Sequence, residues 1–263
     1  MMSADCSHKP GDLILALCGT EERLQLILGQ PGPGGYSLLA SRQWTVPGQS
    51  IRFLTPGLKE MLDGFGVGVE AIGKIACVRG PGSFTGLRLA LAAAQGIAAG
   101  HNIPLAGIDY LPLLASGPAP LIDGTLHVLT YARRGLVYLQ SFNAPDLAEI
   151  NPLASLSLDE AAARIVELGS TAHLMGSGLR KNPDFFSDLA ASHDGYTLLG
   201  SQWENPSPET LLAAAVNGDY SGATVDPVYV RPTDAEDNLP QFAKKRGMDP
   251  GKAVERLKEL QKG

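Results

Sequence analysis

The sequence predicts an α/β protein with two lobes, each built from a mixed β-sheet flanked by helices. Apolar runs typical of strands form a strand–turn–strand unit twice along the chain, and each unit is followed by helical patterns and further strands. The chain has 263 residues, of which 44% are hydrophobic, and this suffices for the cores of two ordinary lobes. Between the two units, segment 112–120 contains three prolines and one glycine, so the lobe boundary is expected there.

The first half of the chain is expected to hold a three-stranded meander, followed by alternating helices and strands. Turn residues at 19–22 and 31–35 separate the first three apolar runs. Because proline favours the first turn of a helix, Thr55-Pro56 is expected to begin a helix that continues through Leu62. The other elements expected in this half are strands at 13–18, 23–28, 36–44, 75–78 and 104–108 and helices at 85–100 and 110–115.

The second half repeats this pattern, which suggests duplicated lobes. Ser157-Leu-Asp-Glu160 forms a capping box, in which the Ser and Glu side chains bind free backbone N–H groups, and it predicts a helix to Leu168. Ser207-Pro208 predicts a further helix to about Asn217. The strands expected here are 126–131, 137–142 and 172–175. These patterns assign 11–112 to the N-terminal lobe, 113–232 to the C-terminal lobe and 233–263 to a basic linker with a short helix.

The tail differs from the rest of the chain in its charge. From Gln241 to Gly263 there are seven Lys or Arg and three Asp or Glu, a net charge of +4 in a chain whose formal net charge is −6. Asp249-Pro250 is expected to begin a last helix with an apolar face. The residues of that face are Val254, Leu257 and Leu260. Two interpretations stay open: a basic surface for tRNA or an acidic partner, and a solvated helix that packs on the protein's own body.

Residues 80–100 form the most informative segment, because a strand there runs into a glycine-rich turn that opens a helix. Backbone N–H groups at a helix N-terminus attract anions, so the turn is a candidate phosphate-binding site. Its candidate residues are Gly80, Gly82, Ser83, Thr85 and Gly86. The spacing G-x-G-x-x-x-G departs from the dinucleotide motif, and no Lys-Ser or Lys-Thr follows as in a Walker A loop. A structural turn that caps the helix is the alternative.

The segment Gly80-Pro-Gly-Ser-Phe-Thr-Gly-Leu-Arg88 resembles the signature of the TsaB (YeaZ) family. Further segments occur in the family's order: Ile103–Gly107, Ala132–Gly135 with Val137-Tyr138, Met175–Gly178 and Pro227–Arg231. The resemblance covers residues 11–232 and excludes the tail. It implies a duplicated fold of the actin, Hsp70 and sugar-kinase type, which is ribonuclease H-like.

Members of this family are the partner subunit in the bacterial formation of N6-threonylcarbamoyladenosine at position 37 of tRNAs. The resemblance therefore implies a non-catalytic scaffold that activates a TsaD-like transferase and offers a surface to a TsaE-like ATPase. A cytoplasmic location is expected because no targeting segment is visible in the sequence. It also implies that helices of the N-terminal lobe pair with the transferase or with a second copy of the chain. Contact with tRNA is expected to be indirect or through the basic tail.

Two carboxylates that help ATPases of this fold hold magnesium are replaced in this chain. In the family, an Asp commonly ends the first strand and another Asp opens the Asp-Ala-Arg motif of the second lobe. The corresponding positions here are Cys18 and Tyr131, and neither side chain replaces a carboxylate on magnesium. The sequence therefore predicts no catalytic residue, no cofactor and no ATP hydrolysis by the usual route of the fold.

Other site chemistries also find little support. No two histidines are four residues apart, unlike the His-x-x-x-His pair of the related catalytic subunit, so no metal site is expected and each histidine is interpreted as a surface or loop residue. The histidines are His8, His101, His127, His173 and His193. Three scattered cysteines, Cys6, Cys18 and Cys77, fit free thiols in a reducing compartment. The apolar run 13–17 is too short to span a membrane.

The helix after the motif carries small residues every four positions, which places them on one face. These residues are Gly86, Ala90, Ala94 and Ala98. With the family resemblance, this face predicts an interface with another subunit. The expected neighbours on the preceding helix are Leu58, Met61 and Leu62. Under this hypothesis Ala94→Arg abolishes partner binding while the chain stays folded; the alternative is that both helices pack only on the sheet of their own lobe.

Two other functions stay open. A glycopeptidase-like hydrolase, a label often attached to relatives of this family, needs a nucleophile–base pair or a metal, and the sequence offers neither. A weak nucleotide-binding sensor would instead use the Gly80–Gly86 turn.

Overall fold

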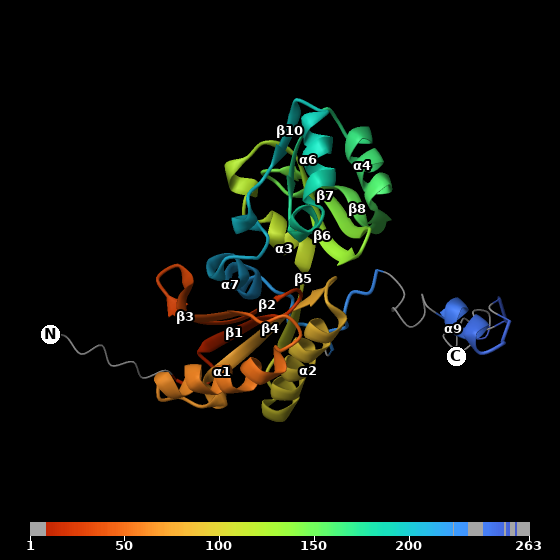
Figure 1. The fold of residues 1–263 in the computed structure, drawn as a ribbon. Coiled ribbons are helices and arrows are strands. Elements are labelled where there is room, and N and C mark those ends of the chain that lie inside the picture. The colour runs from red at the N-terminus through yellow and green to blue at the C-terminus, as the bar shows by residue number, and fades with distance from the viewer. Residues whose placement is uncertain (1–8, 223, 231–238, 250, 253–255, 257–263) are drawn as a thin grey trace. The chain divides into compact units, whose positions relative to one another are not determined.

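Two mixed five-stranded sheets flanked by helices confirm the predicted two-lobed α/β fold (Figure 1). The computed structural model describes residues 9–222, 224–230, 239–249, 251–252 and 256. Residues up to Val228 form one compact unit that includes both sheets, and the chain from Tyr229 onward forms a second unit, which contains helix α9 (Leu239–Lys245). The two units are described separately.

The first sheet has the strand order β3-β2-β1-β4-β5. Its strands are β1 (Leu13–Cys18), β2 (Arg23–Gly32), β3 (Gly35–Thr45), β4 (Ile72–Gly80) and β5 (Leu105–Asp109). The pairs among β1, β2 and β3 are antiparallel, whereas β4 pairs in parallel with both β1 and β5. All six residues of β1 are buried, since β1 is the central strand and both faces of the sheet are covered.

The second sheet has the order β10-β9-β6-β7-β8, which is the same topology read in the opposite direction. Its strands are β6 (Gly124–Arg133), β7 (Leu136–Ala144), β8 (Ala148–Ser157), β9 (Thr171–Met175) and β10 (Gly195–Leu198). Again the first three strands pair antiparallel and the last two pair in parallel. The identical connectivity supports the expected duplication of the lobe.

Helices α1 (Ile51–Gly64) and α2 (Phe84–His101) cover one face of the first sheet, and their apolar side chains join those of β1, β2 and β4 in one core (Figure 1). The second sheet has a core of its own, formed with α4 (Leu158–Glu167) and α6 (Pro183–Ala191). The short helix α5 (Ser177–Lys181) follows β9 and packs on β6. Within the described residues, no helix combines the length and apolar character needed to cross a bilayer.

Two helices cross between the lobes. Helix α3 (Tyr110–Ala115) follows the first sheet but packs on β6 as well as on β4 and β5. Helix α7 (Pro208–Val216) follows the second sheet and packs on β1, β2 and β3. Gly29 on β2 allows this contact, because a Cβ there would meet the Leu212 side chain under 3.0 Å. The division at residue 112 therefore stays a prediction.

Most of the expected elements are present, and the capping box of Ser157 and Glu160 is formed on both sides. The expected start of α1 at Thr55 is wrong: the helix begins four residues earlier and holds Pro56 inside it. Burial of Leu54 on the same face as Leu58 favours the longer helix over the positional preference of proline. Strands β8 and β10 and helices α5 and α6 were not predicted. The apolar face at Val254, Leu257 and Leu260 lies outside the described residues.

Candidate functional site

The glycine-rich turn between β4 and α2 packs against the turn between β1 and β2. A Cβ on Gly82 would lie under 3.0 Å from the Thr20 carbonyl oxygen, and one on Gly86 equally close to the Gly19 carbonyl oxygen. The Ser83 backbone N–H donates to the Thr20 carbonyl oxygen at 2.6 Å. The glycines thus let two backbones meet, and one N–H group that would face a phosphate is already bound.

Three of the five candidate phosphate-binding residues, Ser83, Thr85 and Gly86, line a pocket of about 130 Å³. Gly80 and Gly82 do not line it. Glu21 does, which places a carboxyl group where an anion would have to sit. Pockets for drug-sized ligands occupy about 300–1,000 Å³, so this space is small by itself, but a second pocket shares its residues Glu21, Gly48 and Ser83. Phosphate binding at this turn stays a prediction.

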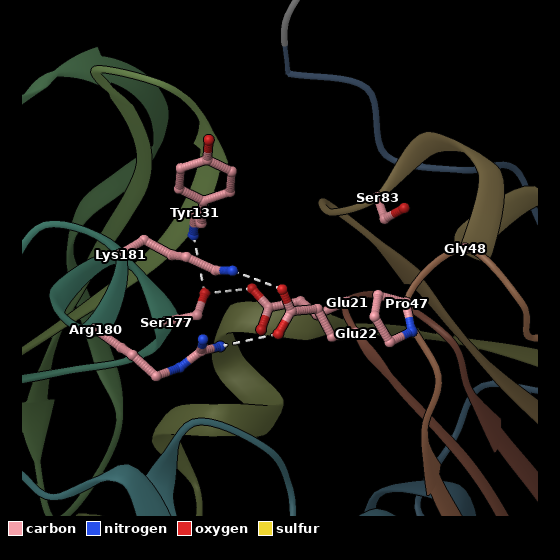
Figure 2. Close-up of a pocket in the computed structure, with 9 residues that line it drawn as sticks. All are labelled: Glu21, Glu22, Pro47, Gly48, Ser83, Tyr131, Ser177, Arg180 and Lys181. Carbon is pink, nitrogen blue, oxygen red and sulfur yellow. Dashed lines mark hydrogen bonds and ion pairs between the residues drawn. The ribbon is translucent and has the colours of Figure 1, made fainter.

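A second pocket, of about 120 Å³, lies where the lobes meet, and it joins segments that are far apart in the sequence (Figure 2). One wall comes from the β1–β2 turn, the loop between β3 and α1, and the motif turn. The other comes from the end of β6 and from α5. The lining residues are Glu21, Glu22, Pro47, Gly48, Ser83, Tyr131, Ser177, Arg180 and Lys181.

Charged and polar side chains bridge the lobes across this pocket, as the dashed lines in Figure 2 show. The Ser177 hydroxyl donates to the Glu21 carboxyl group and accepts the Tyr131 backbone N–H at 3.0 Å. Glu22 pairs with Lys181 at 2.6 Å and with Arg180 at 3.4 Å. The motif Met175–Gly178 gives no indication of these bridges, because contacts over more than 150 residues leave no local pattern in the sequence.

The two glutamates of the β1–β2 turn have opposite pKa shifts. Burial raises the pKa of Glu21 to about 7, against the hydrogen bond from Ser177, which lowers it. The hydrogen bond from Lys181 lowers the pKa of Glu22, which is exposed enough to remain solvated. The pocket therefore holds one carboxyl group poised near neutral pH beside one that is ionised.

Cys18 and Tyr131, which replace the expected acids, have different surroundings. Burial raises the pKa of the Cys18 thiol to about 11, so it is neither a metal ligand nor an activated nucleophile. Its Sγ donates to the Thr20 hydroxyl at 3.7 Å. Tyr131 lies at the pocket, with the Lys181 ammonium 5.8 Å from its ring centroid. Hydrophobic and aromatic side chains thus stand where the fold commonly has carboxylates.

The small-residue face of α2 is not a free surface, and this corrects the residues expected for an interface. Ala90 and Ala94 are 0% exposed, and both belong to the core of the first lobe. The core also contains Ala98, Leu58, Met61 and Leu62, while Gly86 packs on Gly19. The face is small because α2 lies close to its own sheet, so the alternative interpretation holds for these residues and Ala94→Arg would disrupt the fold.

The solvent-facing side of α2 has a small-residue character of its own. Phe84 is 43% exposed and stacks under the Arg88 guanidinium, whose centre is 3.8 Å from its ring centroid. Further along the same side Ala92 and Gly96 are exposed. At the start of α1, Ile51 is 67% exposed. The helix pair therefore still presents an outer surface with apolar groups.

The interpretation of every histidine as a surface residue is wrong for His127. This side chain is 0% exposed on β6, and its Nδ1 lies 2.8 Å from the Ser141 hydroxyl. Burial lowers its pKa to about 4, so it is neutral at physiological pH. Its place within the apolar run of the expected strand 126–131 was a signal of burial. In the described part of the chain, no three His, Cys, Asp or Glu side chains gather in a way that could hold a metal ion.

Comparison with known proteins gives one consistent set of relatives. A family model for TsaD, tRNA N6-adenosine threonylcarbamoyltransferase, matches residues 48–168. The tRNA threonylcarbamoyladenosine biosynthesis protein TsaB of Escherichia coli (strain K12) is 29% identical over 205 residues, covering 74% of this chain and 86% of that protein. The protein of the same name from Bacillus subtilis (strain 168) is 26% identical over 192 residues, with 71% and 81% covered.

Solved structures agree on the fold. YeaZ from Pseudomonas aeruginosa has a TM-score of 0.59 and 22% identity and covers 92% of this chain and 98% of its own. A protein described as similar to peptidase YEAZ from Pseudomonas aeruginosa has a TM-score of 0.62 and 23% identity, with 84% and 100% covered. Similarity to the curated proteins along most of the chain coincides with the Gly80–Arg88 motif, and both support the resemblance of this chain to the TsaB (YeaZ) family.

Proposed function

We propose that this chain takes part in forming N6-threonylcarbamoyladenosine on tRNA, as a non-catalytic subunit that binds and activates a TsaD-like transferase. The names of its curated relatives support the pathway. The observation that carries the non-catalytic role is the space between the lobes. The pocket there is about 120 Å³ and is bridged by the ion pair of Glu22 and Lys181, so a nucleotide would have to displace this pair.

The residues at the two replaced positions support the same role. Magnesium requires oxygen ligands, and neither the buried Cys18 thiol nor the Tyr131 ring supplies a carboxylate. A subunit that lacks these groups would act by binding its partner and not by catalysing a reaction. It stabilises the active conformation of its partner because it binds that conformation more tightly than the others.

We propose the outer side of α1 and α2 as the partner surface. Phe84, Ala92 and Gly96 lie on the solvent side of α2, and small residues there let a partner helix approach closely. The exposed Ile51 side chain at the start of α1 adds apolar area that a partner would cover. The same surface would serve a second copy of the chain when the transferase is absent.

Roles for the other expected partners are also proposals. A TsaE-like ATPase would bind the assembled pair, and tRNA would be held by the transferase. Lys244, Lys245 and Arg246 are exposed in the second unit and would add phosphate contacts, whose contribution falls steeply with salt. The cytoplasmic location follows from this function and stays a prediction.

The first test mixes the chain with the TsaD-like subunit of the same organism and measures mass by light scattering on a sizing column. We expect a complex with the natural chain and none with Ala92→Arg, because the added side chain blocks the approach of a partner helix. Ala163→Arg, at an exposed position of α4 in the other lobe, is the matched control and should bind normally.

A second readout follows the modification itself. Addition of the chain to the other purified components should raise threonylcarbamoyladenosine formation, and Ala92→Arg should lose that effect. Full stimulation by Ala92→Arg, or a complex of unchanged mass, would remove the α2 surface from the proposal. Heat on titration of the chain alone with ATP or ADP would favour the nucleotide-sensor function instead.

A further inference from the structure

The pocket of about 130 Å³ lies between the beginnings of α1 and α2, and the proposed function assigns no ligand to it. Its lining combines a carboxyl group, hydroxyl groups and apolar side chains. The lining residues are Glu21, Gly48, Ser50, Ile51, Ser83, Thr85, Gly86 and Leu89. The hydrogen-bonding groups among them that the protein itself leaves unused indicate what the pocket can bind.

The Ser50 hydroxyl is the first of these unused groups. Ser50 is 8% exposed and precedes α1, yet its hydroxyl makes no cap bond to the helix and no hydrogen bond to any other described residue. A buried hydroxyl normally has a partner, because leaving it unpaired costs free energy. The pocket that Ser50 lines is where a ligand can supply that partner.

The beginning of α2 offers further donors. The first four N–H groups of an α-helix have no acceptor within the helix, and the Ser83 side chain does not cap those of α2. The Ser83 N–H is bound to the Thr20 carbonyl oxygen, whereas the N–H groups of Thr85 and Gly86 have no such acceptor in the described chain. The dipole of this 18-residue helix adds partial positive charge at the same end. This side of the pocket therefore favours an anionic group.

Glu21 gives the pocket a second, opposite character. Its carboxyl group accepts the Ser177 hydroxyl, and no Lys or Arg of the described chain forms an ion pair with it. Glu22 beside it pairs with both Lys181 and Arg180. Glu21 would repel a simple anion such as phosphate, whereas a ligand that also carries an ammonium group would provide the missing cation.

We propose that this pocket binds a small free α-amino acid in its zwitterionic form. The carboxylate of the ligand accepts from the Ser50 hydroxyl and from the free N–H groups of α2, and its ammonium group donates to Glu21. Ile51 and Leu89 border the same space and suit a short apolar side chain. Both charges of the ligand thus meet the opposite charge of the pocket.

The size of the pocket suits such a ligand. A cavity of about 150 Å³ is large enough for benzene, which has as many non-hydrogen atoms as alanine. The neighbouring pocket of about 120 Å³ shares Glu21, Gly48 and Ser83, so a slightly longer side chain has room there. A ligand with only one of the two charges leaves either the carboxyl group or the helix N-terminus unpaired, and it should bind more weakly.

Calorimetric titration of the full chain with alanine tests the proposal. The titration is done at about pH 8, above the pKa of about 7 that burial gives Glu21, so that the carboxyl group is ionised. We expect alanine to bind at a single saturable site. Ethylamine is alanine without its carboxylate, and propionate is alanine without its ammonium group. Each should bind at least about tenfold more weakly than alanine.

Three variants locate the site. Glu21→Gln removes the charge but keeps a hydrogen-bonding side chain, and Ser50→Ala removes the hydroxyl. Each should weaken alanine binding about tenfold. Glu22 lines the neighbouring pocket and not this one, so Glu22→Gln is the matched control and should bind alanine as the natural chain does. In the NMR spectrum of the natural chain, alanine should shift the amide signals of Thr85 and Gly86.

Any of three results would overturn the amino-acid site. The first is that alanine does not bind the natural chain, and the second is that ethylamine or propionate binds as tightly as alanine. The third is that Glu21→Gln and Ser50→Ala both keep full binding, or that Glu22→Gln loses it. Circular dichroism checks that each variant is folded. The titration contains no transferase, so its outcome is separate from that of the partner-binding test.

Discussion

In the first lobe the fourth strand, β4, ends in a glycine turn that leads into the 18-residue helix α2, whereas in the second lobe the equivalent strand β9 leads into α5, which has five residues. Both turns nevertheless approach the backbone of their first hairpin. Gly82 and Gly86 meet the carbonyls of Thr20 and Gly19, and Gly176 and Gly178 meet that of Leu129. In both lobes, therefore, the turn after the fourth strand must pack closely on the first hairpin. The length of the helix after that turn can differ between the lobes.

The lobes also differ in their cores. Among the described residues of the first lobe, one buried side-chain atom, the Oε1 of Gln25, has no hydrogen-bond partner. In the described second lobe four such atoms lack a partner: the Nε2 of His127, the Oγ1 of Thr130, the Oε1 of Gln140 and the Nδ1 of His173. We expect the second lobe to be the less stable one, because each unsatisfied buried group costs free energy.

The largest effect should come from the two faces of α2. Ala94→Arg places a charge in the core of the first lobe and should lower the free energy of unfolding by about 3–5 kcal/mol. Ala92→Arg, on the outer side, should change it by less than about 0.5 kcal/mol. Urea unfolding of both variants measures the contrast. Equal stability would mean that the core assigned to α2 is wrong.

The glycine turn of the second lobe should be nearly as sensitive. Gly176 has φ +110°, and a Cβ there would lie under 3.0 Å from the Leu129 carbonyl, so Gly176→Ala should cost about 2–4 kcal/mol of unfolding free energy. Gly96→Ala, in open space on α2, should instead stabilise the protein by about 0.5–1 kcal/mol. A tolerated Gly176→Ala would contradict the shared requirement argued above.

Acid should weaken the second lobe through His127. Its pKa is about 4 in the folded chain and 6.5 when solvated, so only the unfolded chain gains a proton as pH falls between these values. Stability should therefore decrease by up to about 1.4 kcal/mol per pH unit from pH 6.5 toward pH 4. His127→Gln should remove this part of the acid sensitivity, measured by urea unfolding at several pH values. His101→Gln, at an exposed position, is the control and should leave the profile unchanged.

The smallest effect concerns helix caps. Ser157 accepts the Glu160 backbone N–H at the start of α4, whereas Ser83 makes no side-chain cap bond at the start of α2. We expect Ser157→Ala to cost about 1 kcal/mol and Ser83→Ala less than about 0.5 kcal/mol. Thermal unfolding resolves the difference, and a larger loss at Ser83 would show that its hydroxyl has another structural role.

The sequence predicted features that depend on neighbouring residues better than features that depend on contacts between distant residues. The strands and α2 follow short-range patterns of apolar and turn residues, and the capping box is a local signal. Helix α5 and helix α6 lack such a pattern, since the segment from Ser177 to Ala191 is short and interrupted by Pro183. The sequence shows that one face of α2 consists of small residues, but it does not show what that face contacts. Close packing on the protein's own sheet and close packing on a partner helix both require small residues.

The site between the lobes shows more clearly how far local sequence patterns can predict a site. Cys18 and Tyr131 could be identified as replacements because the resemblance to the TsaB (YeaZ) family implies an Asp at each of these positions. Glu21 lies in a turn of the first lobe and Ser177 begins α5 in the second, and each residue type is ordinary at such a position. Only the shared topology brings them together, so their contact and the raised pKa of Glu21 could not be derived from local sequence.

The crossing of α7 has a consequence for synthesis of the chain on the ribosome. The first sheet is complete at Asp109, but the helix that covers one of its faces begins only at Pro208. At about 5–20 residues per second, an apolar sheet face would wait about 5–20 s for its cover. In that interval the nascent chain has a finished sheet with one face packed under α1 and α2, while the face that α7 covers still lacks this helix.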